Sequence, residues 1–189
     1  MTELKLCADA ELQRLMEASA AGAEDELAQT DQLLRTYPDD PRLHFLRGSM
    51  LAGIGRPLEA LPALKRAVDL APDFAIARFQ LGFFLLTSGE PTDALSVWGP
   101  LALLPDEHYL RLFVEGLTHL IRDEFEACIR YLRQGIEANA ENIPLNRDMQ
   151  LLIDKVSNLG PTSSSGIADD SMSSTSFLLD QIAGRGRPN

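Results

Sequence analysis

Apolar positions along the chain follow helical spacing. Segment 75–87 is apolar almost throughout, and a helix of that composition must be covered on more than one side. Segment 143–159 instead carries its apolar residues three or four positions apart, as one face of a helix requires: these are Leu145, Met149, Leu152 and Val156. Both patterns predict helices and an all-α chain.

The same residue classes return every 34 positions over about 100 residues. Glycine recurs at Gly48, Gly82 and Gly116, and small side chains recur at Ala60, Ala94 and Cys128. Large apolar residues keep the same interval at Leu64, Trp98 and Leu132, and again at Phe45, Phe79 and Phe113. Two proline pairs follow it as well, Pro57 with Pro91 and Pro38 with Pro72. The period indicates a repeated structural unit.

Each unit is predicted to hold two helices. In the best-defined unit, residues 88–90 interrupt the apolar segment, and Pro91 follows where proline suits the first turn of a helix. We expect Gly82 to face Ala94 across this helix pair, with Trp98 filling the space beside that contact. Two features depart from the regular pattern, because Pro62 and Gly99-Pro100 are expected to kink or end their helices.

This pattern resembles the tetratricopeptide repeat, a 34-residue helix pair with Leu-Gly, Ala, a large aromatic residue, Ala and Pro at fixed places. One unit matches at Leu81-Gly82, Ala94 and Trp98, and another at Gly48, Ala60, Leu64, Ala67 and Pro72. The third matches at Gly116, Cys128 and Leu132, with Gly135 where alanine is usual. The resemblance implies a right-handed α-solenoid of antiparallel helix pairs, with repeats at 41–74, 75–108 and 109–142.

The flanks complete this domain organisation. Residues 1–40 are expected to form a degenerate capping repeat with helices near 8–20 and 24–36, and 143–159 a terminal cap helix. Residues 160–189 are predicted to be a flexible, polar, disordered tail. This tail carries a short apolar motif that is either a frayed turn or a docking segment: Phe177, Leu178, Leu179 and Ile182.

Charge and composition restrict the partners. The chain has 28 acidic and 17 basic residues, and its net charge of −11 repels nucleic acid and anionic membranes. It has neither a secretory signal nor an apolar run of about 18 residues, and two cysteines make no disulfide framework. We therefore expect a cytoplasmic protein that neither binds nucleic acid nor inserts into a membrane.

Family geometry also suggests where a partner would bind. The first helix of each tetratricopeptide unit lines the concave face, which places three stripes there: Phe45, Ser49 and Ala52; Phe79, Phe83 and Leu86; Phe113, Leu117 and Leu120. These side chains either pack repeat against repeat or form an apolar groove for a partner's amphipathic helix or extended peptide. A third possibility is that the tail motif occupies the groove, in the same chain or in a neighbouring one.

Sequence signals for carboxylate binding, metal binding and catalysis are weak. Family members that clamp a C-terminal carboxylate use basic residues and asparagine on these helices, whereas only Arg42 among the corresponding positions suits a carboxylate. His44, His119 and the Asp106–His108 segment lack metal-ligand spacing, so no metal or cofactor is expected. Cys128 replaces a packing alanine and is predicted to be buried and inert, whereas Cys7 is expected to be exposed. No catalytic residue is predicted.

The sequence thus favours an adaptor or chaperone-like module that holds another protein. In size, repeat number and acidity the chain resembles the small chaperones of bacterial type III secretion translocators. The alternative is a self-associating assembly subunit without a separate client. An enzyme would require chemistry that these motifs do not supply.

Overall fold

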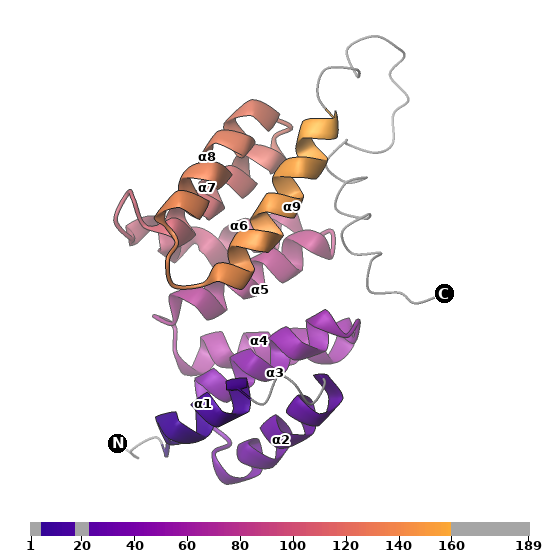
Figure 1. The fold of residues 1–189 in the computed structure, drawn as a ribbon, viewed down its shortest axis with the longest axis vertical. Coiled ribbons are helices and arrows are strands. Elements are labelled where there is room, and N and C mark those ends of the chain that lie inside the picture. Colours follow the sequence, from indigo (N-terminus) through magenta and orange to yellow (C-terminus); the bar gives the residue numbers. More distant parts are fainter. Residues whose placement is uncertain (1–4, 18–22, 160–189) are drawn as a thin grey trace. The chain divides into compact units, whose positions relative to one another are not determined.

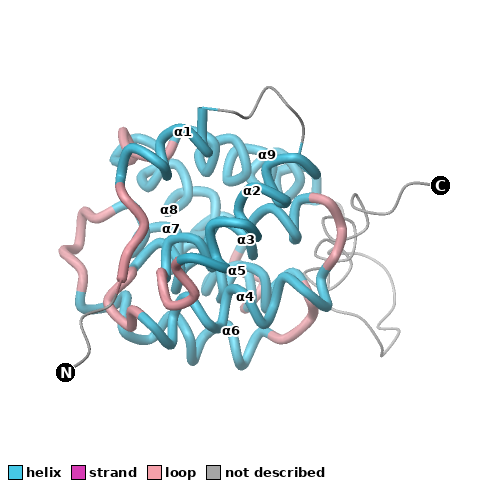
Figure 2. Tube along the Cα trace, turned by 90° about the horizontal axis from the view of Figure 1, so that it is seen from below, coloured by secondary structure: helices cyan, strands magenta, loops and turns pink. Residues whose placement is uncertain are grey.

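The computed structural model describes residues 5–17 and 23–159, and within these ranges it contains helices and connecting loops but no strand (Figure 2). Two compact units divide the chain between Phe84 and Leu85, inside helix α5 (Ala75–Thr87). Among the described residues, the first unit holds four complete helices, and the second holds four more with one 3₁₀ helix. The expected fold class, all-α and built from helix pairs, is confirmed over the described residues.

In the first unit, α1 (Asp9–Glu17) and α2 (Ala23–Thr36) precede α3 (Pro41–Gly53) and α4 (Pro57–Leu70). Helices α3 and α4 pack along each other, and α2 packs against α3 (Figure 1). The close approach of α3 and α4 depends on Gly48, because a Cβ atom there would lie 2.7 Å from Leu64 Cγ. The pattern predicted an alanine opposite this glycine with the large residue beside it, whereas the atoms nearest to a Cβ at Gly48 all belong to the large residue, Leu64.

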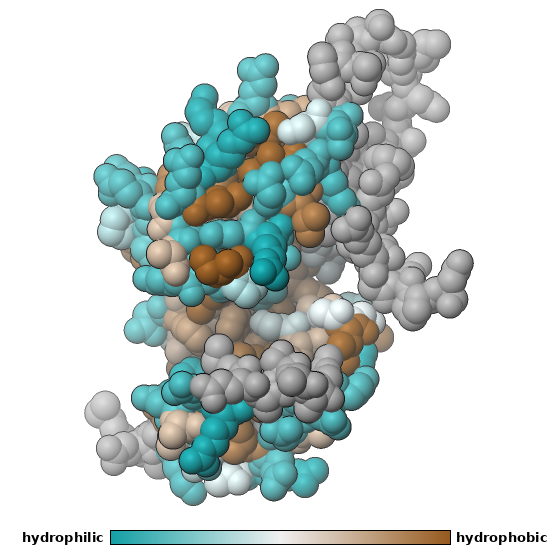
Figure 3. All heavy atoms as spheres, in the orientation of Figure 1, coloured by the Kyte–Doolittle hydropathy of each residue, from teal (hydrophilic) through white to brown (hydrophobic). Residues whose placement is uncertain are grey.

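The second unit continues α5 and adds α6 (Pro91–Trp98), the 3₁₀ helix η2 (Gly99–Leu103), α7 (Tyr109–Ile121), α8 (Phe125–Ala138) and α9 (Ile143–Leu159). Here α7 packs on α8 through Gly116, where a Cβ atom would lie 2.8 Å from Leu132 Cδ2. Helix α9 packs on α8, and the face of these two helices seen in Figure 3 carries hydrophilic side chains with hydrophobic ones between them. The pair α7–α8 therefore repeats the packing of α3–α4.

The turns inside the pairs α3–α4, α5–α6 and α7–α8 each contain one residue with a left-handed backbone. Gly55 has φ +75° and Gly89 has φ +84°, whereas Asp123 takes the same place in the third pair with φ +58°. These positions are 34 residues apart, so the turn follows the sequence period. Glycine adopts this conformation without a steric penalty, and aspartate tolerates it better than most residues.

The two proline departures have different outcomes. Helix α6 ends at Trp98, and the chain enters η2 at Gly99-Pro100, as expected. Helix α4 in contrast continues through Pro62, so of the two expected effects, a kink or an end, proline does not end the helix. Pro62 lies in the second turn, where its missing N–H leaves the carbonyl of Leu58 without a donor. Leu58 is 90% exposed, so water can supply that hydrogen bond.

Candidate functional site

The predicted binding stripe on α3 is partly open. Phe45, Ser49 and Ala52 are all half-buried, and the ring of Phe45 meets that of Phe74 edge to face at 5.4 Å between centroids. The hydroxyl oxygen of Ser49 is buried, and it has no hydrogen-bond partner among the described residues. A buried hydroxyl without a partner is unusual in a folded protein.

The stripe on α5 is more deeply packed. Phe79 is fully buried, whereas Phe83, one turn later, is half-buried, and the two rings stack with centroids 6.2 Å apart. Leu86, on the part of α5 that belongs to the second unit, is fully buried. Only Phe83 of these three therefore retains accessible surface.

The stripe on α7 is core. Phe113, Leu117 and Leu120 have no exposed surface, and the ring of Phe113 lies against Gly135 of α8, so closely that a Cβ atom there would overlap it. Tyr109 adds an edge-to-face contact to Phe113 at 6.0 Å. Gly135 replaces the usual alanine at a position where this ring needs the space.

The tail motif Phe177, Leu178, Leu179 and Ile182 lies outside the described residues. Its proposed docking therefore stays a prediction.

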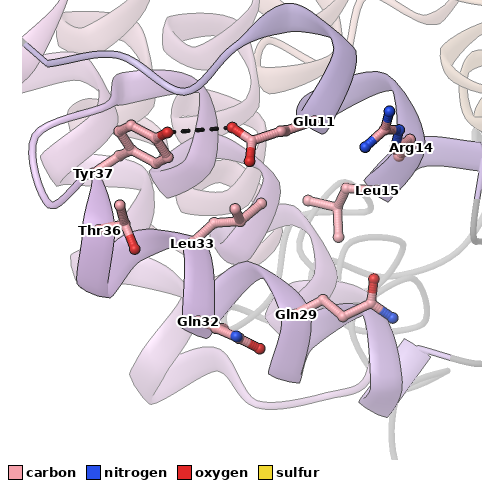
Figure 4. Close-up of a pocket in the computed structure, with 8 residues that line it drawn as sticks. All are labelled: Glu11, Arg14, Leu15, Gln29, Gln32, Leu33, Thr36 and Tyr37. Carbon is pink, nitrogen blue, oxygen red and sulfur yellow. Dashed lines mark hydrogen bonds between the residues drawn. The ribbon is translucent and has the colours of Figure 1, made fainter.

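A cleft that the repeat pattern did not predict lies between α1 and α2 (Figure 4). It encloses about 390 Å³, within the range of small-ligand sites. Its lining comes from three residues of α1, four of α2 and the residue that follows α2: Glu11, Arg14 and Leu15; Gln29, Gln32, Leu33 and Thr36; and Tyr37. The spacing of Gln29, Gln32 and Thr36 on one edge of a helix was visible in the sequence, but the position of α1 opposite that edge was not.

A buried carboxylate holds the N-terminal segment in place. Asp40 is fully buried and accepts hydrogen bonds from the Cys7 backbone N–H (2.8 Å), the Arg42 backbone N–H (2.9 Å) and the Arg42 guanidinium (2.8 Å from Nη2). Arg42 also donates to the Cys7 carbonyl (2.6 Å) and to Asp9 (2.7 Å). We call Cys7, Asp9, Asp40 and Arg42 the N-terminal latch.

The latch overturns one expectation. Cys7 is 3% exposed rather than open to solvent, because both of its backbone polar groups bind the Asp40–Arg42 pair. It packs with Leu12, Leu15 and Leu43. Arg42, the one candidate for holding a partner's carboxylate, is already engaged by carboxylates of this chain.

The ionisation of these groups follows from their surroundings. Burial alone would raise the pKa of Asp40, but the hydrogen bonds from Arg42 and from the Cys7 N–H outweigh it and lower the pKa. Burial, with the nearby Glu11 carboxylate, raises the pKa of Cys7 to about 11. Burial raises the pKa of Cys128, which is fully buried as predicted, to about 12. Neither thiol is activated as a nucleophile.

The histidines have structural partners. His44 contacts the Pro38 carbonyl through Nε2 at 2.7 Å, and His108 caps α7 by accepting from the Leu110 N–H at 3.2 Å. His119 pairs with Glu124 and stacks on Tyr131. Among the described residues, no group of three or more His, Cys, Asp or Glu side chains is placed to hold a metal ion. In the same part of the chain, no helix has the length and apolarity needed to cross a membrane.

Comparisons with known proteins agree with the repeat. The tetratricopeptide-repeat family model matches residues 27–72 and 51–99, and no curated protein is similar to the chain in sequence. A solved structure of MamA, residue 41 to the end, from Desulfovibrio magneticus RS-1, has a TM-score of 0.55 and 18% identity; the alignment covers 82% of this chain and 96% of that one. A MamA RS-1 double mutant has a TM-score of 0.52 and 16% identity; the alignment covers 92% of this chain and 90% of that one. At these identities the two structures show a shared fold alone. The family match over residues 27–99, together with the glycine positions and the left-handed turns, shows that this part of the chain is built from tetratricopeptide repeats.

Proposed function

We propose that this protein is an adaptor or chaperone-like module that holds an apolar helix or extended segment of another protein. Tetratricopeptide repeats are protein-interaction scaffolds, so protein binding follows from the family. The finer proposal is that the partner lies on the first unit, over Phe45, Ser49 and Phe83. The observation that carries it is the contrast between these half-buried residues and the completely buried stripe on α7.

The chemistry of this surface favours an apolar partner with a few polar groups. Phe45 and Phe83 offer aromatic surface, which contributes strongly to protein interfaces. The Ser49 hydroxyl is buried, so its neighbours would have to shift before it could pair with a carbonyl oxygen or an N–H of the bound segment. The net charge of −11 favours basic residues flanking that segment, through an attraction that salt screens.

The proposal also includes cytoplasmic localisation and the absence of catalysis. Both cysteines are free thiols, as is usual in a reducing compartment.

The test is capture of partner proteins from the native lysate on the immobilised full chain. We expect Phe45→Ala and Phe83→Ala to reduce capture about tenfold or more, because truncating a central aromatic anchor costs about 2 kcal/mol. Leu58→Ala is the matched control, because Leu58 is 90% exposed and belongs to α4 rather than to α3 or α5. Capture that persists in helical, folded Phe45 and Phe83 variants would contradict the proposal.

Sedimentation distinguishes a client from a second copy of the chain. If the wild-type protein keeps the mass of one chain at all concentrations, the surface is free for a client. A dimer that dissociates in Phe45→Ala would instead show that the occupant is a second copy, and would favour an assembly subunit.

A further inference from the structure

The cleft between α1 and α2 is the strongest unassigned site in the described chain. Its base is apolar, with Leu15 3% exposed and Leu33 half-buried, while its edges carry polar side chains (Figure 4). An apolar base with a few polar groups along the rim is the usual composition of a binding site. The cleft lies between α1 and α2, whereas the proposed partner surface lies on α3 and α5.

The polar groups along α2 form a line that matches a peptide backbone. Gln29, Gln32 and Thr36 are three and four residues apart, so they follow one edge of the helix over about 10 Å. An extended peptide covers that length with about three residues. Each carboxamide offers both a donor and an acceptor, and a backbone amide needs both. Exposed carboxamides in such a row suit a peptide better than they suit a single charged ligand.

The two ends of the cleft differ in charge. Glu11 and Tyr37 lie at one end, where the tyrosine hydroxyl donates to the carboxylate at 3.3 Å and the Cys7 thiol lies 3.5 Å from the same oxygen. Arg14 lies towards the other end and is exposed, and among the described residues its guanidinium has no hydrogen-bond or ion-pair partner. The cleft therefore has one uncommitted cation, in a chain with a net charge of −11.

We propose that the α1–α2 cleft is a second peptide-binding site, which takes an extended segment of a partner protein with an apolar residue followed by an acidic one. The apolar side chain covers Leu33 and Leu15, and the carboxylate pairs with Arg14. The carboxamides of Gln29 and Gln32 hold the backbone between them. This site is independent of the surface on α3 and α5, so each can fail without the other.

The experiment is a titration of the ¹⁵N-labelled full chain, followed by NMR, with two capped peptides, Gly-Leu-Leu-Asp-Gly and Gly-Leu-Leu-Lys-Gly. The Asp peptide is expected to shift the side-chain amides of Gln29 and Gln32 and the backbone amides of residues 29–37 at millimolar concentrations. The Lys peptide should bind about fivefold more weakly, because an exposed ion pair contributes about that factor.

Two variants make the test specific. Arg14→Glu should weaken binding of the Asp peptide about fivefold and reverse the preference between the two peptides. Arg35→Glu removes an exposed cation of α2 that does not line the cleft, and it should leave binding unchanged. The proposal would be overturned by equal binding of both peptides, by no effect of Arg14→Glu, or by no shift at all. It would also be overturned if the shifts appeared at Phe45, Ser49 and Phe83, which would assign the peptide to the other surface.

Discussion

At the scale of single residues, the backbone conformation of the turn, rather than the space around it, decides which residues the turn of each repeat tolerates. Gly55, Gly89 and Asp123 all have positive φ at equivalent positions. A Cβ atom added at Gly89 would meet no other atom within 4 Å, so space does not restrict this position. Any cost of substitution there comes from the left-handed conformation itself.

We therefore expect Gly89→Ala to lower the free energy of unfolding by about 1 kcal/mol or more. Gly99→Ala is the matched control, because Gly99 is equally open but has helical angles, φ −42° and ψ −50°. That change should raise stability by about 0.5 kcal/mol, since alanine reduces the entropy of the unfolded chain. Urea unfolding of both variants measures the difference, and equal effects of the two substitutions would refute this account.

At the scale of helices, most boundaries could be predicted from the sequence. Pro57 and Pro91 begin α4 and α6 where the 34-residue period places them. These boundaries were predictable because proline and turn residues act locally on the chain. The continuation of α4 through Pro62 was not, because it depends on whether solvent reaches one particular carbonyl.

The candidate sites were less predictable than the helices. The 34-residue period makes Phe45, Phe79 and Phe113 equivalent, but their burial differs because it depends on which helices cover each one. The burial of Cys7 depends on contacts with Asp40 and Arg42, more than 30 residues away in sequence. No local pattern encodes such contacts.

The N-terminal latch should make the attachment of α1 sensitive to acid. The pKa of Asp40 is lower in the folded protein than in the unfolded chain. Its contribution to stability is therefore fully present above the unfolded pKa of about 4, and is lost as pH falls through the folded value. Hydrogen exchange of the Cys7 amide, which donates directly to Asp40, reports on this bond.

We expect the protection factor of the Cys7 amide in the wild-type protein to be constant above about pH 5 and to fall below about pH 4. In Asp40→Asn it should already be low at neutral pH and change little with acid, because the amide side chain does not titrate. Asp39→Asn is the control: Asp39 is exposed and pairs with Arg66 instead. An acid-dependent loss of protection that remains in Asp40→Asn would assign it to another group.

At the scale of the whole molecule, each of the two units contains fully buried apolar residues. Leu51 and Ala60 belong to a cluster of the first unit, whereas Phe113 and Leu132 are buried in the second. In repeat proteins, stability is approximately a sum of local terms and nearest-neighbour terms. A substitution should therefore act mainly on the unit that contains it.

The single tryptophan allows this to be tested. Trp98 is 1% exposed in the second unit, so its fluorescence follows that unit, whereas far-ultraviolet circular dichroism follows all helices. Gly135→Ala forces a Cβ atom into the ring of Phe113 and should cost about 1–3 kcal/mol, which moves the Trp98 transition to lower urea. Asp40→Ala leaves the Arg42 guanidinium without its buried partner, and should move part of the dichroism transition at a similar cost. In Asp40→Ala, the urea midpoint followed by Trp98 fluorescence should stay unchanged. If it shifts as far as the dichroism midpoint does, the two units unfold together, and the prediction that a substitution acts mainly on its own unit is wrong.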